Sequence, residues 1–160
     1  DMHVKHCFEV CRAVKNKTAG EAVAYLNEVL RIDSDRADIR RKATAVPFRL
    51  GSGNKRKRRS GPSMVGHRKG GVGPGRFPVK ASRAIIKVIE SAMENARFQY
   101  EDIDADEMVI THIAAHRGPI RKGWTPRARG RATPSNHYRV NLEVFLEDMN
   151  VMSDELEDDF

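Results

Sequence analysis

Three residues near the start of the chain could form a metal or thiol site. His3, Cys7 and Cys11 are spaced four residues apart, so on a helix all three would share one face. Imidazole and thiolate ligands suit zinc, and this spacing would also permit a zinc- or thiol-dependent enzyme. Phe8 and Val14 extend the same stretch at helical spacing, and unpaired cysteine is among the most often buried residue types. We therefore expect both cysteines to lie in core packing without a metal.

A glycine-rich segment further along could approach phosphates. Residues 70–76 contain four glycines, but Arg76 and Phe77 stand where a Walker loop needs Lys followed by Ser or Thr. The segment fits a cation-bearing loop whose backbone comes close to phosphates better than it fits a nucleotide site. No Ser–His–Asp or paired-carboxylate arrangement stands out. The sequence therefore predicts no enzyme, no cofactor and no small-molecule substrate.

Basic residues are strongly segregated along the chain. Its 160 residues include 29 Lys or Arg against 22 Asp or Glu, which gives a net charge of +7. No acid occurs in residues 39–89, which hold fifteen basic residues, or in residues 116–142, which hold seven more. Residues 143–160 invert this pattern, with eight acids and no base. Cations without competing carboxylates are typical of a surface that neutralises a polyanion, so nucleic-acid binding is favoured over two solvated basic loops.

Composition narrows the class of protein further. Apolar residues make up 39% of the chain and the mean hydropathy is −0.60, and no stretch approaches the roughly 20 apolar residues of a membrane-spanning helix. Residues 1–6 lack the apolar core of a signal peptide, and two cysteines cannot form a disulfide framework. We expect a cytoplasmic protein with no membrane partner, of a size that suits one domain.

Apolar periodicity predicts three helices. Residues 4–15 carry apolar side chains at helical spacing, and residues 80–99 carry an unbroken apolar stripe. Thr18 stands three residues before Glu21, which is the spacing of a capping box. We therefore expect Thr18 to be the N-cap of a helix that ends near Ile32.

Two strands are expected in the second half of the chain. Residues 108–115 are rich in β-branched side chains and residues 138–146 alternate apolar with polar, so they should form an antiparallel hairpin with His112 and His116 on its polar face. Residues 47–78 are rich in Gly, Pro and Arg without periodicity, which predicts a long loop that is either functional or disordered. The helix stripe and the sheet should share one core through Ile85, Ile89, Met93, Val140, Leu142 and Val144.

These elements predict an α+β fold: three helices packed on a small antiparallel sheet, with a protruding β-hairpin and a basic glycine-rich central loop. We expect a single domain over residues 1–160, with a globular core formed by about 1–46, 80–116 and 137–149, a basic loop at 47–79, an extended hairpin at 117–136 and an acidic tail at 150–160. In the hairpin, Arg side chains alternate with small residues, so guanidinium groups and backbone can both reach phosphates and base edges.

The arginine-rich segment resembles a known family. Residues 126–132, preceded by Gly118 and Pro119, are similar to the signature of the large-subunit ribosomal proteins of the L-twenty-two family. Further similar stretches follow the family's order over nearly the whole chain: 11–15, 18–22, 45–49, 66–70, 75–81, 90–96 and 112–116. The long middle loop and the histidine-bearing strand resemble the archaeal branch of that family.

The resemblance implies a structural constituent of the large ribosomal subunit that binds large-subunit rRNA and bridges rRNA segments during assembly. It also implies contact with neighbouring large-subunit proteins, and a hairpin tip that lines the peptide exit tunnel beside the nascent polypeptide. The charge pattern alone leaves open a free-standing nucleic-acid-binding protein.

Candidate residues for both roles follow from the same matches. The candidate rRNA-binding residues are Arg49, His67, Arg68, Lys69, Arg76, Lys80, Arg83, Lys87, Arg117, Arg121, Lys122, Trp124, Arg127 and Arg131. The candidate tip residues are Arg127, Ala128, Arg129 and Gly130, where Gly130 would supply a positive φ and Arg129 would face the tunnel. We expect the hairpin to be ordered by rRNA, because Ile120 and Trp124 are its only large apolar groups.

Overall fold

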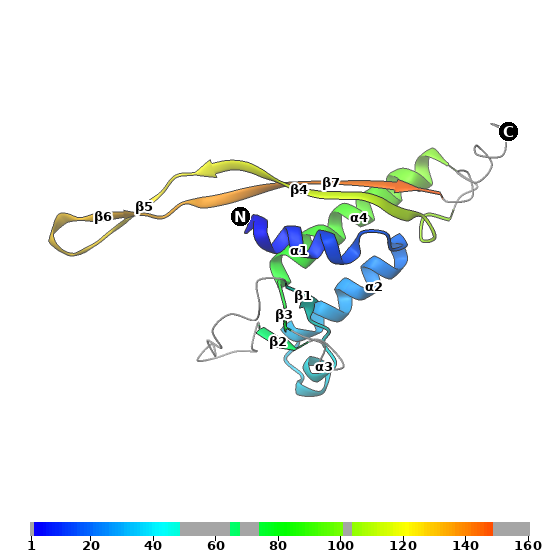
Figure 1. The fold of residues 1–160 in the computed structure, drawn as a ribbon, viewed down its shortest axis with the longest axis horizontal. Coiled ribbons are helices and arrows are strands. Elements are labelled where there is room, and N and C mark those ends of the chain that lie inside the picture. Colours follow the sequence, from blue (N-terminus) through cyan, green and yellow to red (C-terminus); the bar gives the residue numbers. More distant parts are fainter. Residues whose placement is uncertain (1, 49–64, 68–73, 101–103, 149–160) are drawn as a thin grey trace.

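A long two-stranded ribbon runs over a group of helices, and one end of it projects well beyond them (Figure 1). The computed structural model describes residues 2–48, 65–67, 74–100 and 104–148. The helices are α1 (Val4–Val14), α2 (Ala19–Leu30), α3 (Ala37–Arg41) and α4 (Val79–Gln99), with 3-10 turns at Arg31–Asp33 and Ala128–Gly130. The strands are β1 (Val46–Pro47), β2 (Val65–His67), β3 (Pro74–Arg76), β4 (Val109–Arg121), β5 (Trp124–Pro126), β6 (Ala132–Pro134) and β7 (His137–Glu147). The predicted α+β class is confirmed.

Capping groups set the boundaries of the first two helices. His3 caps α1, where its Nδ1 accepts a hydrogen bond from the backbone N–H of Lys5 at 3.3 Å. The chain leaves α1 through Asn16, whose φ of +62° lies in the left-handed region that asparagine tolerates. Thr18 then caps α2, because its Oγ1 accepts from the backbone N–H of Glu21 at 3.3 Å. The predicted N-cap of this helix is therefore confirmed.

Four short elements lie where the sequence pattern predicts none. Within the expected loop of residues 47–78, β1, β3 and β2 form a small antiparallel sheet in that order, with Val46 and Val65 both paired to Arg76. Before it, α3 is a five-residue helix with no buried side chain. Such short segments carry too few residues to show a period, so tertiary placement rather than local pattern decides their conformation.

The ribbon is longer than its expected strands. β4 pairs with β7 antiparallel from Val109 opposite Glu147 to Arg121 opposite His137, and β5 pairs with β6 out to Pro126 opposite Ala132. The expected strands cover residues 108–115 and 138–146, and the extended hairpin expected at 117–136 continues them. Ladder hydrogen bonds join backbone groups, so pairing continues through polar sequence where no apolar alternation marks a strand.

Gly123 allows the two parts of the ribbon to join. Its carbonyl oxygen accepts a hydrogen bond from the backbone N–H of Ser135 at 2.7 Å. A Cβ atom at Gly123 would stand 2.7 Å from the carbonyl oxygen of Ser135, closer than real Cβ contacts come. A side chain at this position would therefore force the two arms apart.

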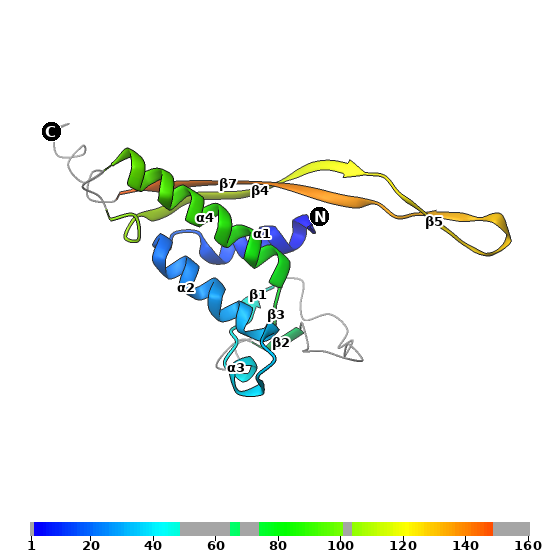
Figure 2. The same cartoon turned by 180° about the vertical axis from the view of Figure 1, so that it is seen from behind.

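The core lies between the helices and the inner face of the ribbon. α4 packs against β7 and α1 packs against β4, and Figure 2 shows α4 crossing in front of the ribbon. Its largest fully buried side chains include Val10, Val14, Leu26, Val29, Ile85, Ile89 and Ile110. Val140, Leu142 and Val144 are half-buried and pack against this cluster, which also contains Met93. The expectation that the helix stripe and the sheet share one core is confirmed.

Two aromatic side chains are exposed, although their spacing places them on the apolar faces of their elements. Phe8 is 56% exposed because Cys7, Val10, Cys11 and Val14 form the buried stripe of α1 and leave Phe8 beside it. Tyr138 is 47% exposed, near the start of β7.

The buried position of Ile89 makes it a test of this core. We expect Ile89→Ala to lower the free energy of unfolding by about 2–5 kcal/mol, because the substitution leaves a cavity where no solvent reaches. Ile120→Ala on the exposed hairpin is the matched control and should change stability little. Chemical denaturation of the purified chain measures both, and equal midpoints for the two variants would contradict the core described above.

Candidate nucleic-acid interface

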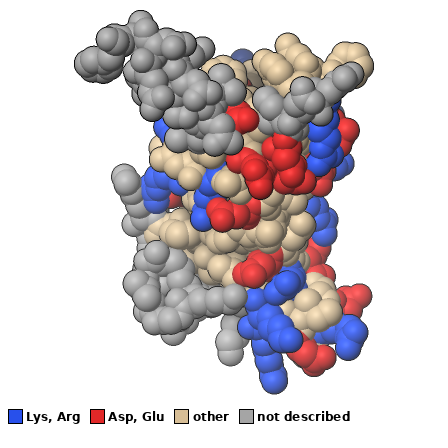
Figure 3. Space-filling model, turned by 90° about the vertical axis from the view of Figure 1, so that its right-hand side faces the viewer, with Lys and Arg blue, Asp and Glu red and all other residues tan. Residues whose placement is uncertain are grey.

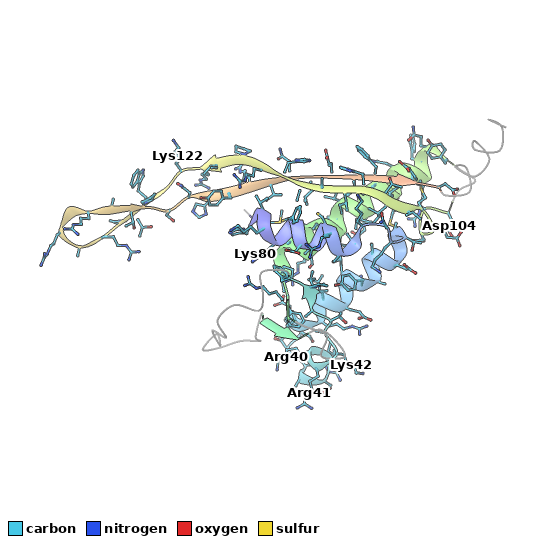
Figure 4. All side chains as sticks on the ribbon, in the orientation of Figure 1. Arg40, Arg41, Lys42, Lys80, Asp104 and Lys122 are labelled. Carbon is cyan, nitrogen blue, oxygen red and sulfur yellow. The ribbon has the colours of Figure 1, made fainter. Side chains whose placement is uncertain are left out.

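The protruding part of the ribbon carries cations on both arms and no carboxylate. Residues 116–142 contain seven basic side chains and no acid, and all seven are exposed: Arg117, Arg121, Lys122, Arg127, Arg129, Arg131 and Arg139. Trp124 lies among them with 69% of its surface exposed. In Figure 4, Lys122 lies on this arm while Asp104 lies at the opposite end of the molecule. Guanidinium groups beside an open indole match the phosphates and stacked bases of a nucleic acid.

The tip turns within five residues. The backbone N–H of Arg127 donates to the carbonyl of Arg131 at 2.7 Å, and Arg127 Nε donates to Oγ1 of Thr133 at 3.2 Å, which ties this side chain to the opposite arm. Gly130 has a φ of +68°, as expected, and Arg129 has a φ of +59°. The left-handed conformation at Arg129 is unfavourable for a side-chain-bearing residue, so the turn rather than local preference holds it.

The cations expected on α4 differ in their surroundings. Lys80 and Lys87 are exposed, and Lys80 lies at the start of the helix near the root of the hairpin (Figure 4). Arg83 instead forms an ion pair with Asp33, with both side chains about half exposed. A nucleic acid that used Arg83 would therefore compete with a carboxylate, whereas Lys80 and Lys87 have no ion pair within the described part of the chain.

Arg76 is packed rather than free. Its guanidinium carbon lies 5.2 Å from the centre of the Phe48 ring, and its Nε is buried without a hydrogen-bond partner among the described residues. His67 takes part in β2 through its backbone, opposite Pro74. The candidates Arg49, Arg68 and Lys69 lie outside the described residues.

The candidates predicted from the sequence do not include a further basic group: Arg40, Arg41 and Lys42. These residues end α3 and project from the lower end of the molecule (Figure 4). Viewed from the end opposite the hairpin, Figure 3 shows blue side chains at this lower end and acidic side chains across the upper half. The sequence could have indicated this basic group, because its three residues are the first cations of the acid-free stretch that begins at Ile39.

The carboxylate nearest to the hairpin is held by two imidazoles. Nε2 of His116 lies 2.8 Å, and Nε2 of His112 lies 3.0 Å, from the same Oε1 of Glu143. Hydrogen bonds from His116 and then His112 lower the pKa of Glu143 below its ordinary value. The expectation that both histidines lie on the polar face of the hairpin is confirmed. Glu143 therefore marks the border between the acid-bearing end of the ribbon and the cationic end.

The two cysteines are buried within α1. Cys7 is fully buried and Cys11 nearly so, and burial is the main reason that the pKa of Cys7 is raised and that of Cys11 reaches about 12. The expected burial is confirmed. Within the described residues, no group of three or more His, Cys, Asp or Glu side chains is arranged to hold a metal ion.

Comparisons with known proteins point in one direction. The family model described as ribosomal protein L22p/L17e matches residues 1–147. The large ribosomal subunit protein uL22 of Methanopyrus kandleri is 41% identical over 147 residues, which cover 90% of this chain and 79% of that protein. The protein of the same name from Natronomonas pharaonis is 40% identical, covering 91% of this chain and 81% of its own length.

No helix in the described ranges is long and apolar enough to span a membrane.

Burial of the thiols predicts their reactivity. Because only the thiolate is nucleophilic and burial raises both pKa values, we expect Cys7 and Cys11 to resist alkylation by iodoacetamide in the folded protein at neutral pH. The same reagent should label both residues rapidly after unfolding in urea. Mass spectrometry counts the adducts. Rapid double labelling without denaturant would show that α1 does not bury its cysteines.

Proposed function

The chain belongs to the ribosomal protein L22p/L17e family, and from this premise we propose that it binds large-subunit rRNA and joins separate rRNA segments. It is a structural constituent of the large subunit of the cytoplasmic ribosome. Its role there is to bind and to position RNA, without a catalytic step. Its partners are rRNA, neighbouring proteins of the subunit and, at the hairpin tip, the nascent polypeptide.

The acid-free hairpin carries this proposal. A two-stranded ribbon that projects from its core is marginal alone, and fixing each residue opposes order by about 1–2 kcal/mol of backbone entropy. Burial within the chain offsets little of this, because Ile120 and Trp124 are 51% and 69% exposed. The exposed cations supply the missing stabilisation when they lie against phosphates. The hairpin is therefore a segment whose order depends on RNA.

Cations on separate elements support a bridging role. The hairpin projects along the ribbon, the group Arg40, Arg41 and Lys42 lies on α3, and Lys80 begins α4 (Figure 4). One molecule therefore presents positive charge in different directions, so it can neutralise phosphates of RNA segments that would otherwise repel one another. Arg49, His67, Arg68 and Lys69 belong to the same proposed surface. A free-standing nucleic-acid-binding protein would not account for the family match.

Phosphate contacts by the hairpin predict a change in salt dependence. Replacing Arg121 and Lys122 together by Gln should flatten the slope of log K against log salt for rRNA binding by about 1.4–1.8, since each lost contact removes roughly 0.7–0.9. Arg97→Gln is the control, because Arg97 lies at the acidic end and pairs with Glu94 and Asp106. Filter binding over a range of salt concentrations measures the slopes. A slope unchanged in the double variant would remove these two residues from the interface.

The shape of the tip supports a place in the exit tunnel. The hairpin ends in a five-residue turn, residues 127–131, at the far end of the ribbon (Figure 1). Arg127 is held against Thr133, whereas Arg129 stands at the apex of the turn in the left-handed conformation. We assign Arg129 to the tunnel lumen, with Arg127 and Arg131 held by rRNA.

This assignment predicts a crosslink to the nascent chain. A photoreactive amino acid at position 129, in subunits stalled with a nascent peptide, should attach to the peptide once the peptide is long enough to reach the tip. The same amino acid in place of Phe98, exposed on α4, is the control and should not attach to the peptide. Crosslinks from position 129 to rRNA alone, at every peptide length, would exclude the tunnel role and leave rRNA binding intact.

A further inference from the structure

A pocket of about 470 Å³ lies at the root of the hairpin. Three segments far apart in sequence meet there: the start of α1, the link from β3 into α4, and the beginning of β7. The backbone N–H of Met2 donates to the carbonyl of Tyr138 at 3.1 Å, which joins the first segment to the third. The volume falls within the range of pockets that hold small organic ligands, about 300–1,000 Å³.

The wall of this pocket combines flat rings with positive charge. His3 and His6 stack with their ring centres 5.3 Å apart, and His6 meets the Phe48 ring edge-on at 5.6 Å. His137 and Tyr138 at the start of β7 also line the pocket. Arg76 and Lys80 add two cations to the lining, Met2, Phe77 and Val79 add apolar surface, and none of the described lining residues is an acid. Rings that accept stacking, surrounded by cations, fit a planar ligand that carries a negative charge.

The start of α4 adds further donors at the same place. Val79, Lys80 and Ala81 line the pocket and form the first turn of this helix of 21 residues. The N-cap is Pro78, and no side chain caps the helix. The backbone N–H of Val79 donates to the carbonyl of Phe77 at 3.0 Å, so the N–H groups of Lys80 and Ala81, with the positive end of the helix dipole, favour an anion beside the rings. Arg76 Nε, buried and unpartnered among the described residues, is a further donor in this lining.

We propose that this pocket receives one unstacked nucleotide of the rRNA, with the base against the rings of His3, His6 and Tyr138 and the phosphate between Arg76, Lys80 and the start of α4. The proposal rests on the proposed function, rRNA binding, and adds a site for a base to the backbone contacts of the hairpin. RNA is read most specifically where a base leaves its stack and enters a pocket of this kind.

The protonation of His6 agrees with contact to a base. Burial, with His3 and Arg76 next in importance, lowers the pKa of His6 from 6.5, so the ring is mainly neutral at pH 7. A neutral imidazole has one donor and one acceptor nitrogen, as the edges of bases do. The cations Arg76 and Lys80 line the same pocket, so the phosphate and the base meet different kinds of group there.

Binding measurements separate stacking from phosphate contact. We expect Tyr138→Ala to weaken binding of in-vitro-transcribed large-subunit rRNA about tenfold, the effect of losing one stacked base, with an unchanged salt slope. Tyr138→Phe should bind like the unaltered protein because it keeps the ring. Phe145→Ala is the control, an exposed aromatic of the same strand outside the pocket. A Tyr138→Ala variant that binds as tightly as this control would overturn the stacking assignment.

Ultraviolet crosslinking of assembled subunits locates the base. We expect mass spectrometry to find a nucleotide attached to His3, His6 or Tyr138, and Asn136→Trp, which fills the pocket from its rim, should abolish that adduct but not adducts on the hairpin. Hairpin adducts without any at the pocket, or a protein crosslink at the pocket, would refute the nucleotide site and leave rRNA binding standing. Failure of the unaltered protein to bind rRNA at all would refute both proposals.

Discussion

The antiparallel ladder of β4 and β7 continues past the point where the helices stop covering it, and the rest of the molecule depends on that continuation. Over the first part of the ribbon, Ile110 and Ile113 face the core. Beyond Arg121, the pairing of β5 with β6 holds side chains that are exposed. Backbone hydrogen bonds are indifferent to side-chain type, so one ladder serves as a wall of the core at one end and as a carrier of cations at the other. Close contact of Gly123 with Ser135 keeps the two arms together where apolar packing has ended.

Charge follows the same division. The acids of the described chain lie over the helices and the covered end of the ribbon (Figure 3), and the border residue, Glu143, is engaged by His112 and His116. Beyond it, phosphates would meet no competing carboxylate. A carboxylate among the hairpin arginines would cancel part of the potential that attracts RNA and would hold guanidinium groups in internal ion pairs, as Asp33 holds Arg83.

The sequence predicts those parts of the fold that local physics decides. The α4 stripe with Ile85 and Ile89 and the Thr18 cap each follow from one segment, whereas the positive φ of Gly130 is expected from the turn that the family resemblance implies. The resemblance to the L-twenty-two family, confirmed by the family match, supplies the hairpin's role as an expectation. Contacts between distant segments escape such reasoning. The sequence around Arg83 does not predict its ion pair with Asp33, which lies fifty residues earlier in the chain. Likewise, only the folded structure places His3 and Tyr138 in the same pocket. The sheet of β1, β3 and β2 is likewise made by pairing between segments without a period of their own.

The residues that stabilise the fold and the residues proposed to contact RNA lie in different parts of the chain. A strongly basic hairpin can therefore coexist with a well-packed core. The core residues of α1, α2 and α4 supply the burial that stabilises the fold, so the hairpin contributes little to folding and its sequence is free to suit RNA. Conversely, its order is coupled to binding, because ordering a ribbon without a core requires interaction with a partner. The pocket lies at the junction between the packed core and the projecting hairpin. Its walls come from α1, α4 and β7, which the core holds in place, so it is formed before RNA arrives. A preformed site at the root can therefore fix the base of the hairpin while its arms are still free to find their contacts.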